Sequence, residues 1–256
     1  MQEQHDSLSI EQTVQSVEEE LELSDSSRFL SAVVNAYQVA KNNLKADSFY
    51  KAYDWLPADS SYTIKIELLI GKLFKTKQQI FLLRRHTYWT THVDVYKVVD
   101  DTIKNIISNV IEYGSYVNDS IFDVNGDGYH DFLVHYYPAS GCCRRNTYIV
   151  YLYIASKGKF SEGYEFINPT FSPQEGIIRG VEYGHSGEAG LYKYKWNGLA
   201  VDTIEYIYPD AATKGRFIKT THSTYIHTDQ EGIVLPAVPK EYHNIDDYDW
   251  FSFDLE

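Results

Sequence analysis

Cysteine and long apolar runs are scarce in this sequence, and each shortage excludes a class of protein. The only two cysteines, Cys142 and Cys143, are adjacent, so they cannot link distant parts of the chain. They form neither a CxxC redox pair nor a zinc ligand set. We expect two thiols here, with a strained vicinal disulfide as the alternative. No apolar run reaches the roughly 18 residues that a membrane-spanning helix requires, so none is expected.

Familiar catalytic motifs are also missing. The sequence contains no GxSxG, Walker A, GxGxxG or HExxH pattern, and its nine histidines are scattered without a metal-ligand spacing. We therefore expect a binding protein rather than an enzyme, with no catalytic residue assigned. A hydrolase remains the third alternative, because Glu182 and Glu188 could form a carboxylate pair of the kind that cleaves glycosidic bonds.

Positive charge is in short supply, with 23 Lys and Arg against 36 Asp and Glu and a net charge of −13. Such a chain is repelled by phosphate backbones, which argues against a nucleic-acid partner. The excess lies at the two ends: residues 1–30 contain eight acids and one Arg, and residues 241–256 contain six acids and no Lys or Arg. We expect an acidic flexible arm over residues 1–23 and a single β-rich domain over residues 24–256, ending in an acidic-aromatic tail.

Hydrophobic spacing predicts one helix followed by many strands. Apolar residues recur at helical spacing, with a cap at residues 24–26, at Leu30, Val33, Val34, Tyr37, Ala40 and Leu44. From residue 62 the period changes to two, and strands are expected over residues 62–70, 79–84, 93–99, 132–137, 148–154, 177–183, 191–196, 199–207 and 217–224. Asn197-Gly198 predicts a type I′ hairpin turn, and Lys157-Gly158 a second turn.

The fold class that follows is mainly β, with one N-terminal α-helix. We expect antiparallel sheets arranged as a sandwich, a barrel or a propeller-like fold. No repeat of fixed period is evident in the sequence, which disfavours a propeller built from copies of one unit.

Residues 123–131 read DVNGDGYHD, the pattern of a calcium-binding loop between two predicted strands. Side-chain oxygens occur at loop positions 1, 3, 5 and 9, a backbone carbonyl is available at position 7, and glycine stands at position 6. A calcium ion takes six to eight oxygen ligands, which alternate residues of one loop can supply. The predicted ligands are Asp123, Asn125, Asp127, Tyr129 through its carbonyl, and Asp131. Position 12, where an EF-hand has Glu, is Val134, so a strand-loop-strand site is expected.

This loop resembles the FG-GAP, integrin-like and dockerin-like calcium loops of extracellular proteins. The resemblance implies Ca²⁺ as the cofactor, in a structural role that fixes the adjoining strands. An ordinary Asp- and Gly-rich turn without an ion is the alternative.

A wider resemblance covers residues 115–207, including the stretch IRGVEYGHSGEAGLYKYKW at residues 178–196. The pattern is similar to exported bacterial β proteins that include periplasmic immunity proteins against lysozyme-like effectors. It implies a protein partner, and the Ser-Gly…Tyr arrangement resembles a loop that lysozyme inhibitors insert into the active cleft. The implied partner-binding residues are Tyr183, His185, Ser186, Gly187, Glu188 and Tyr192. An ordinary glycine-rich connection between strands is the alternative.

These observations predict a calcium-stabilised exported protein that inhibits a lysozyme-like or other cell-wall-degrading partner. Such enzymes are usually basic, so acidic segments would steer association with them. A surface glycan-binding or adhesive module that uses its many tyrosines is the alternative. The polar start of the sequence resembles that of a mature exported protein, so a periplasmic or cell-surface location is expected, as a secreted protein or lipoprotein with its signal removed. A cytoplasmic location is the other possibility.

Overall fold

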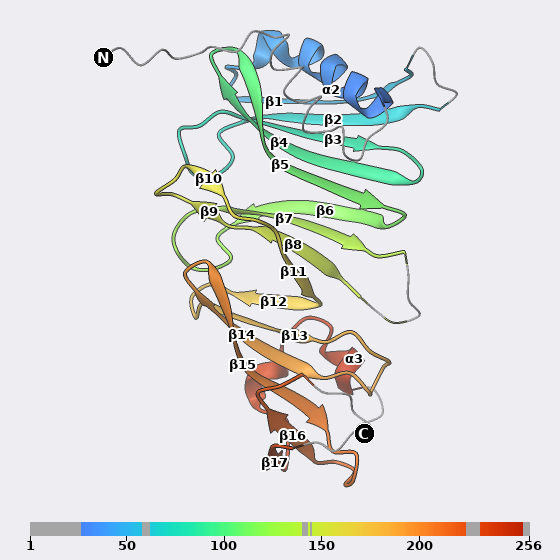
Figure 1. The fold of residues 1–256 in the computed structure, drawn as a ribbon, viewed down its shortest axis with the longest axis vertical. Coiled ribbons are helices and arrows are strands. Elements are labelled where there is room, and N and C mark those ends of the chain that lie inside the picture. The colour runs from blue at the N-terminus through green and yellow to red at the C-terminus, as the bar shows by residue number, and fades with distance from the viewer. Residues whose placement is uncertain (1–26, 58–61, 140–142, 144, 224–230, 253–256) are drawn as a thin grey trace. The chain divides into compact units, whose positions relative to one another are not determined.

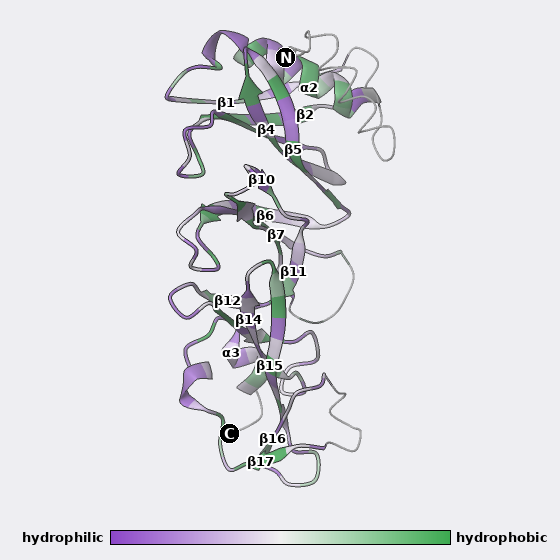
Figure 2. Cartoon of the chain, turned by 60° about the vertical axis from the view of Figure 1, so that its left-hand side comes forward, coloured by the Kyte–Doolittle hydropathy of each residue, from purple (hydrophilic) through white to green (hydrophobic). Residues whose placement is uncertain are grey.

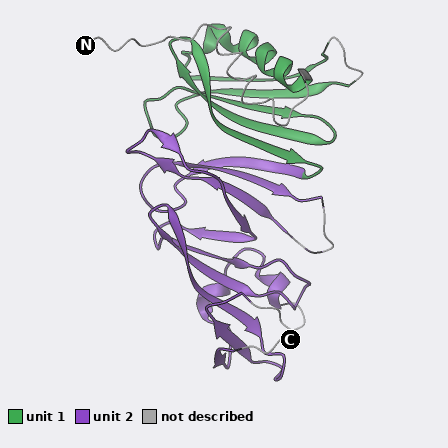
Figure 3. Ribbon diagram, viewed as in Figure 1, with its two compact units in different colours: residues 1–114 green, residues 115–256 purple. Residues whose placement is uncertain are grey.

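The computed structural model describes residues 27–57, 62–139, 143, 145–223 and 231–252. It confirms a mainly β fold with antiparallel sheets and one N-terminal helix (Figure 1). The chain forms two compact units, residues 1–114 and 115–256, which are green and purple in Figure 3. The predicted arm over residues 1–23 lies outside the described residues, and the single domain over residues 24–256 stays a prediction.

Unit 1 is a five-stranded antiparallel meander covered by one helix, with strand order β1-β2-β3-β4-β5. The elements are α2 (Ser27–Ala40), η1 (Lys41–Asn43), β1 (Ser48–Trp55), β2 (Ile64–Gly71), β3 (Ile80–His86), β4 (Thr90–Val99) and β5 (Thr102–Glu112).

The helix α2 carries both hydrophobic and hydrophilic residues, as its colouring in Figure 2 shows. Its buried residues Val33, Tyr37 and Ala40 belong to one core cluster with the buried face of β2. On β2, Ile64 and Ile66 are fully buried while Lys65 between them is exposed. The predicted helical and two-residue periods are therefore both confirmed, and each turns an apolar face toward the same core.

An ion pair is buried in unit 1. Arg85 Nη2 lies 2.5 Å from Asp94 Oδ2, and the two side chains are 0% and 1% exposed. Arg85 Nη1 also donates a hydrogen bond of 2.6 Å to the carbonyl of Phe29 on α2. Ser108 Oγ donates to the second oxygen of Asp94 at 2.8 Å. The pair thus links strands β3, β4 and β5 to the helix, in surroundings where a charge without its partner is costly.

Unit 2 contains a four-stranded sheet of order β11-β8-β7-β6, a two-stranded sheet β10-β9, and a six-stranded sheet of order β12 to β17. Every strand pairing is antiparallel. The strands are β6 (Ser115–Phe122), β7 (Asp131–Tyr137), β8 (Thr147–Tyr151), β9 (Tyr153–Ile154), β10 (Lys159–Phe160), β11 (Tyr164–Ile167), β12 (Pro169–Ser172), β13 (Ile177–Val181), β14 (Leu191–Asn197), β15 (Ala200–Pro209), β16 (Phe217–Thr220) and β17 (Ile233–Leu235). The helical turns η2 (Lys240–Tyr242) and α3 (Tyr248–Ser252) end the described chain.

Two core clusters involve the six-stranded sheet of unit 2. One joins residues of the four-stranded sheet, such as Leu133 and Val150, to Ile178 and Trp196 of the six-stranded sheet. The other joins Val181, Leu191 and Ile207 to residues of the C-terminal segment, namely Val238, Tyr242, Ile245 and Phe251. Among the described strands no sheet closes on itself, so the barrel that was one expected arrangement is not formed.

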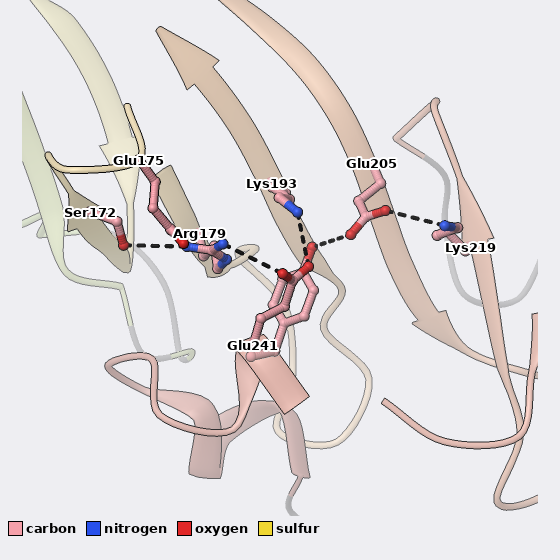
Figure 4. Close-up of polar contacts among 8 residues, drawn as sticks. Ser172, Glu175, Arg179, Lys193, Glu205, Lys219 and Glu241 are labelled. Carbon is pink, nitrogen blue, oxygen red and sulfur yellow. Dashed lines mark hydrogen bonds and ion pairs between the residues drawn. The ribbon is translucent and has the colours of Figure 1, made fainter. Parts of the chain in front are cut away.

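Charged side chains fasten the C-terminal segment to this sheet (Figure 4). Glu241 of η2 accepts a hydrogen bond of 2.9 Å from Lys193 Nζ and lies 3.5 Å from Arg179 Nη2. The adjacent Tyr242 hydroxyl donates to Glu205 Oε1 at 2.9 Å. Trp250 of the acidic-aromatic tail contacts the same unit, because its indole N–H donates to the carbonyl of Gly184 in the loop after β13.

The hairpin β14–β15 is confirmed, but its predicted turn is wrong by one residue. Asn197 pairs with Ala200, so the two loop residues are Gly198 and Leu199. Gly198 has a φ of 60°, whereas Asn197 and Leu199 do not have positive φ. A type I′ turn requires positive φ at both central residues, whereas a type II′ turn has glycine at the first. With glycine first and positive φ at that residue alone, the observed turn matches type II′ and not the predicted type I′. The second predicted turn is confirmed, with Gly158 at a φ of 59° between β9 and β10.

Candidate functional site

The acidic loop at residues 123–131 joins β6 to β7, the strand-loop-strand arrangement predicted from the sequence. The Asp123 carboxylate accepts backbone N–H bonds from Gly126, Asp127 and Gly128, at 2.7, 3.2 and 2.8 Å. Gly126 and Gly128 have φ values of 81° and 90°, a conformation that side chains with a Cβ rarely adopt. The loop is therefore folded around its first carboxylate.

Close packing fixes the position of this loop. A Cβ on Gly126 would lie 2.2 Å from the carbonyl oxygen of Pro173 in the β12–β13 turn. No side chain fits at that distance, so Gly126 is required both for its φ and for the approach of the two segments.

Asp131 is the buried carboxylate of the loop, with no exposed surface. Its two oxygens accept hydrogen bonds from the backbone N–H groups of Val124 at 3.0 Å and Tyr153 at 2.9 Å. The first bond closes the loop, and the second ties it to β9. Burial raises the pKa of Asp131 to about 7; the two N–H bonds oppose the rise, and the charges of Asp127 and Asp123 add to it.

The loop contains the types of oxygen donor that calcium binds, but several of these oxygens are engaged in hydrogen bonds within the loop. Its donors are three carboxylates, the Asn125 amide oxygen and the Tyr129 carbonyl, the oxygen types that Ca²⁺ takes. Asn125 Oδ1 and Asp127 Oδ1, however, accept backbone N–H bonds within the loop. Within the described residues, no three His, Cys, Asp or Glu side chains come together in a group that could hold a metal ion. Calcium binding at Asp123, Asn125, Asp127, Tyr129 and Asp131 stays a prediction.

The second predicted site is the loop between β13 and β14. Tyr183, His185 and Glu188 are exposed, and Ser186 and Gly187 are half-buried.

Tyr192 differs from these residues of the loop, because it is only 3% exposed. Its hydroxyl donates to the carbonyl of Ile167 on β11 at 2.8 Å. Burial is the main reason that its pKa is raised well above the ordinary tyrosine value, and the nearby Tyr194, Glu182 and Tyr206 add to the rise. Tyr192 therefore belongs to a core cluster of unit 2 rather than to the exposed loop.

The helix α3 holds one side of this loop. Trp250 Nε1 donates to the Gly184 carbonyl at 3.0 Å, and the Gly187 N–H donates to the Trp250 carbonyl at 2.9 Å. The Glu182 N–H donates to the Gly190 carbonyl at 2.8 Å, which closes the base of the loop. These bonds give the loop a defined backbone, although its glycines alone would leave it many conformations.

Two described residues of the cysteine-containing segment, Cys143 and Arg145, also contact the loop. Cys143 Sγ is 3.4 Å from His185 Nδ1. The Arg145 guanidinium lies over the ring of Tyr183, 5.0 Å from its centre, and 3.6 Å from Glu165 of β11. The structure thus brings together two motifs that the sequence presents 40 or so residues apart. Cys142 lies outside the described residues, so the state of the cysteine pair stays a prediction.

A pocket of about 400 Å³ lies beside this loop. Its lining combines aromatic rings with carboxylates: Glu165, Phe166, Ile167, Glu182, Tyr183, Tyr192, Tyr194 and Ser223. Glu182 accepts hydrogen bonds from the Tyr208 hydroxyl at 2.7 Å and from Ser223 Oγ at 3.1 Å. Burial raises the pKa of Glu182, and these two hydrogen bonds oppose the rise.

Tyrosines from β14 and β15 support the pocket. The rings of Tyr192 and Tyr194 stack with centroids 4.5 Å apart, and the hydroxyls of Tyr194 and Tyr206 lie 3.1 Å apart. Glu165, Tyr194 and Arg145 were not predicted as site residues from the sequence. Only the two-residue spacing of tyrosines along β14 and β15 signals a shared face. Glu188, proposed as a carboxylate partner of Glu182, is not among the described residues that line the pocket.

No known family matches this chain. Comparison with protein-family models and with curated protein sequences found no relative. Neither α2 nor any other helix in the described part of the chain has the length and apolar character needed to cross a membrane.

Proposed function

We propose that the protein binds a basic surface of a partner protein, with loop 183–188 and the adjoining pocket as the contact. The observation that carries the proposal is the lining of the pocket, where Glu165 and Glu182 accompany four aromatic residues. Carboxylates attract a Lys or Arg side chain, and aromatic faces stabilise the same cation.

Arg145 supports this assignment from within the chain. Its guanidinium packs on Tyr183 and lies within ion-pair distance of Glu165, two residues of the pocket lining. The edge of the pocket therefore already accommodates a cation of this chain, by the two contacts proposed for the partner. The loop is held by α3 before any partner arrives, which lowers the entropy lost on binding.

We further propose that the partner is a lysozyme-like or other cell-wall-degrading enzyme, which the protein inhibits. The support is the sequence resemblance to periplasmic immunity proteins and the net charge of −13, which favours association with a basic enzyme. An exported location, periplasmic or at the cell surface, belongs to the same proposal.

Removing the pocket charges should weaken such a complex. Glu182→Gln keeps an oxygen to accept from Tyr208 or Ser223 but loses the charge, and Glu165→Gln removes the second carboxylate. We expect the Kd for the partner to rise about tenfold or more in the double variant, and inhibition to weaken in parallel. The measurement is inhibition of a panel of purified muramidases, with calorimetric titration of any enzyme inhibited.

Glu162→Gln is the matched control, because Glu162 is an exposed acid of the same unit outside the pocket. It should leave the Kd within about twofold, as expected for a single surface charge outside the contact. Failure to inhibit any muramidase at micromolar protein would reject the proposed partner. Inhibition that is unchanged in the double variant would reject the pocket as the contact.

We also propose that the loop at residues 123–131 holds Ca²⁺ and stabilises unit 2. The support is the donor set, because three carboxylates within one nine-residue loop concentrate negative charge there. A divalent cation would neutralise that charge.

Calcium should therefore raise the melting temperature. At a concentration of about 100 times its Kd, the ion would add about 2.7 kcal/mol to the free energy of unfolding. The measurement is thermal melting in Ca²⁺ against EGTA. Asp127→Asn should abolish the difference and Glu162→Gln should keep it. An identical melting temperature in the two conditions, with no ion retained by the purified protein, would refute the site.

A further inference from the structure

Three aromatic side chains at one end of the sheet in unit 1 are exposed to solvent. Tyr88 is 87%, Trp89 63% and Tyr113 70% exposed. Tyr88 and Trp89 pack edge to face with ring centroids 4.4 Å apart, and the Trp89 and Tyr113 centroids are 6.4 Å apart. Large rings in water are unfavourable, so a connected group of three calls for a reason beyond folding.

The backbone holds these rings together. Tyr88 and Trp89 occupy the turn between β3 and β4, where the Thr87 N–H donates to the Thr90 carbonyl at 2.9 Å. The Thr90 N–H in turn donates to Thr87 Oγ1 at 3.1 Å. Tyr113, just after β5, donates its N–H to the Trp89 carbonyl at 2.8 Å. Hydrogen bonds therefore close the turn that carries Tyr88 and Trp89 and join Tyr113 to that turn.

Tyr113 is the least expected of the three. Its φ is 54°, in the left-handed region that glycine and asparagine adopt more easily than a bulky residue. The side chain is 70% exposed, so little burial offsets this strain. Strained positions of this kind cluster at binding sites.

The residues around the rings limit the class of ligand that can bind there. Segments 87–91 and 112–115 contain Glu112 as their only Asp, Glu, Lys, Arg or His, and several hydroxyl side chains. With no Lys or Arg in these two segments, the turn itself offers little electrostatic attraction for anionic lipid or nucleic acid. Aromatic side chains bury about 150–250 Å² each, so three of them together fall short of the roughly 800 Å² per partner that a stable protein interface buries.

A sugar ring fits these properties. One face of a pyranose presents C–H groups that can lie flat on an aromatic ring, and its edge carries hydroxyls that bond to polar neighbours. We propose that Tyr88, Trp89 and Tyr113 form a platform that binds the pyranose rings of an uncharged glycan. This site is separate from the proposed protein-binding pocket, whose residues all belong to unit 2.

The test is binding of the full chain to neutral polysaccharides by co-sedimentation, and to soluble neutral oligosaccharides by calorimetry and tryptophan fluorescence. We expect Trp89→Ala to weaken binding about tenfold or more, Tyr113→Ala to weaken it less, and Trp89→Phe to retain part of it. Tyr50→Ala is the matched control, because Tyr50 is another exposed aromatic residue of unit 1, on β1. It should bind as the unaltered protein does.

Three results would overturn the platform: no binding to any neutral glycan at millimolar concentration, binding unaffected by Trp89→Ala, or equal loss in Tyr50→Ala. Binding to zwitterionic phospholipid vesicles instead, lost in Trp89→Ala, would assign the cluster to a membrane surface. Trp89-dependent dimerisation in sedimentation velocity, without sugar binding, would assign it to a second copy. Glu182→Gln should keep glycan binding, so failure of the pocket proposal and failure of the platform are distinguishable.

Discussion

Asp94→Ala is expected to lower the free energy of unfolding of unit 1 by about 3–5 kcal/mol, the cost of removing one partner of a buried ion pair. The Arg85 guanidinium would lose the carboxylate that lies 2.5 Å away in a site with no exposed surface. Its bond to the Phe29 carbonyl would remain, but a neutral acceptor compensates a buried charge only in part. Urea denaturation followed by circular dichroism measures the change.

The double variant Arg85→Met/Asp94→Leu is the control for this prediction. It removes both charges, so we expect a smaller loss of unfolding free energy than in Asp94→Ala. Some loss remains, because methionine cannot make the hydrogen bond of Arg85 to the Phe29 carbonyl. Hydrogen exchange should report the loss in residues 64–112 and leave residues 131–137 protected. A cost below about 1 kcal/mol for Asp94→Ala would show that the pair is not held as tightly as its burial implies.

Asp131→Ala is expected to cost about 2–4 kcal/mol in unit 2, measured in EGTA so that metal binding does not contribute. The substitution leaves the N–H groups of Val124 and Tyr153 without their acceptor, and a buried unsatisfied donor costs about 1–3 kcal/mol. The loop would also lose its tie to β9, so faster hydrogen exchange is expected at Tyr153.

Asp131→Asn separates charge from hydrogen bonding. Its amide keeps one oxygen acceptor and places an NH₂ group against the other N–H, so an intermediate loss is expected. Glu162→Gln, an exposed acid of the same unit, should change the free energy of unfolding by less than about 0.5 kcal/mol. If Asp131→Ala unfolds no more easily than Glu162→Gln, Asp131 does not anchor the loop.

Strands with a clear buried face were predicted well from the sequence. Residues 79–84 and 93–99 were expected as strands, and the structure has Ile80–His86 and Thr90–Val99. The strand Ser48–Trp55 was not predicted, and the strand before the acidic loop was expected without bounds, which the structure places at Ser115–Phe122. Both lie at sheet edges, where their side chains remain half-buried or exposed and the alternation of apolar and polar residues is weak. Thr102–Glu112 was also missed, and its register with β4 shifts at Val95/Tyr96, which breaks the two-residue period.

The candidate site was predictable where it depends on local sequence and not where it depends on strand pairing. The spacing of Asp and Gly located the loop at residues 123–131 and its place between two strands. That Asp131 turns inward to β9 depends on a contact 22 residues away. Glu165 joins the pocket only because β11 pairs with β8, where it lies opposite Ile149. Spacing along a chain carries no such information about distant partners.

The C-terminal segment also determines how the protein can be made. Val181, Leu191 and Ile207 of the six-stranded sheet are covered by residues from Val238 to Phe251, which follow these strands in the chain and therefore leave the ribosome after them. Until those residues emerge, the apolar face is open to chaperones and to other nascent chains. Emergence of residues 238–251, rather than pairing of the strands, ends that exposure. A premature stop codon ahead of Val238 would therefore leave every described strand present and one face of the sheet bare.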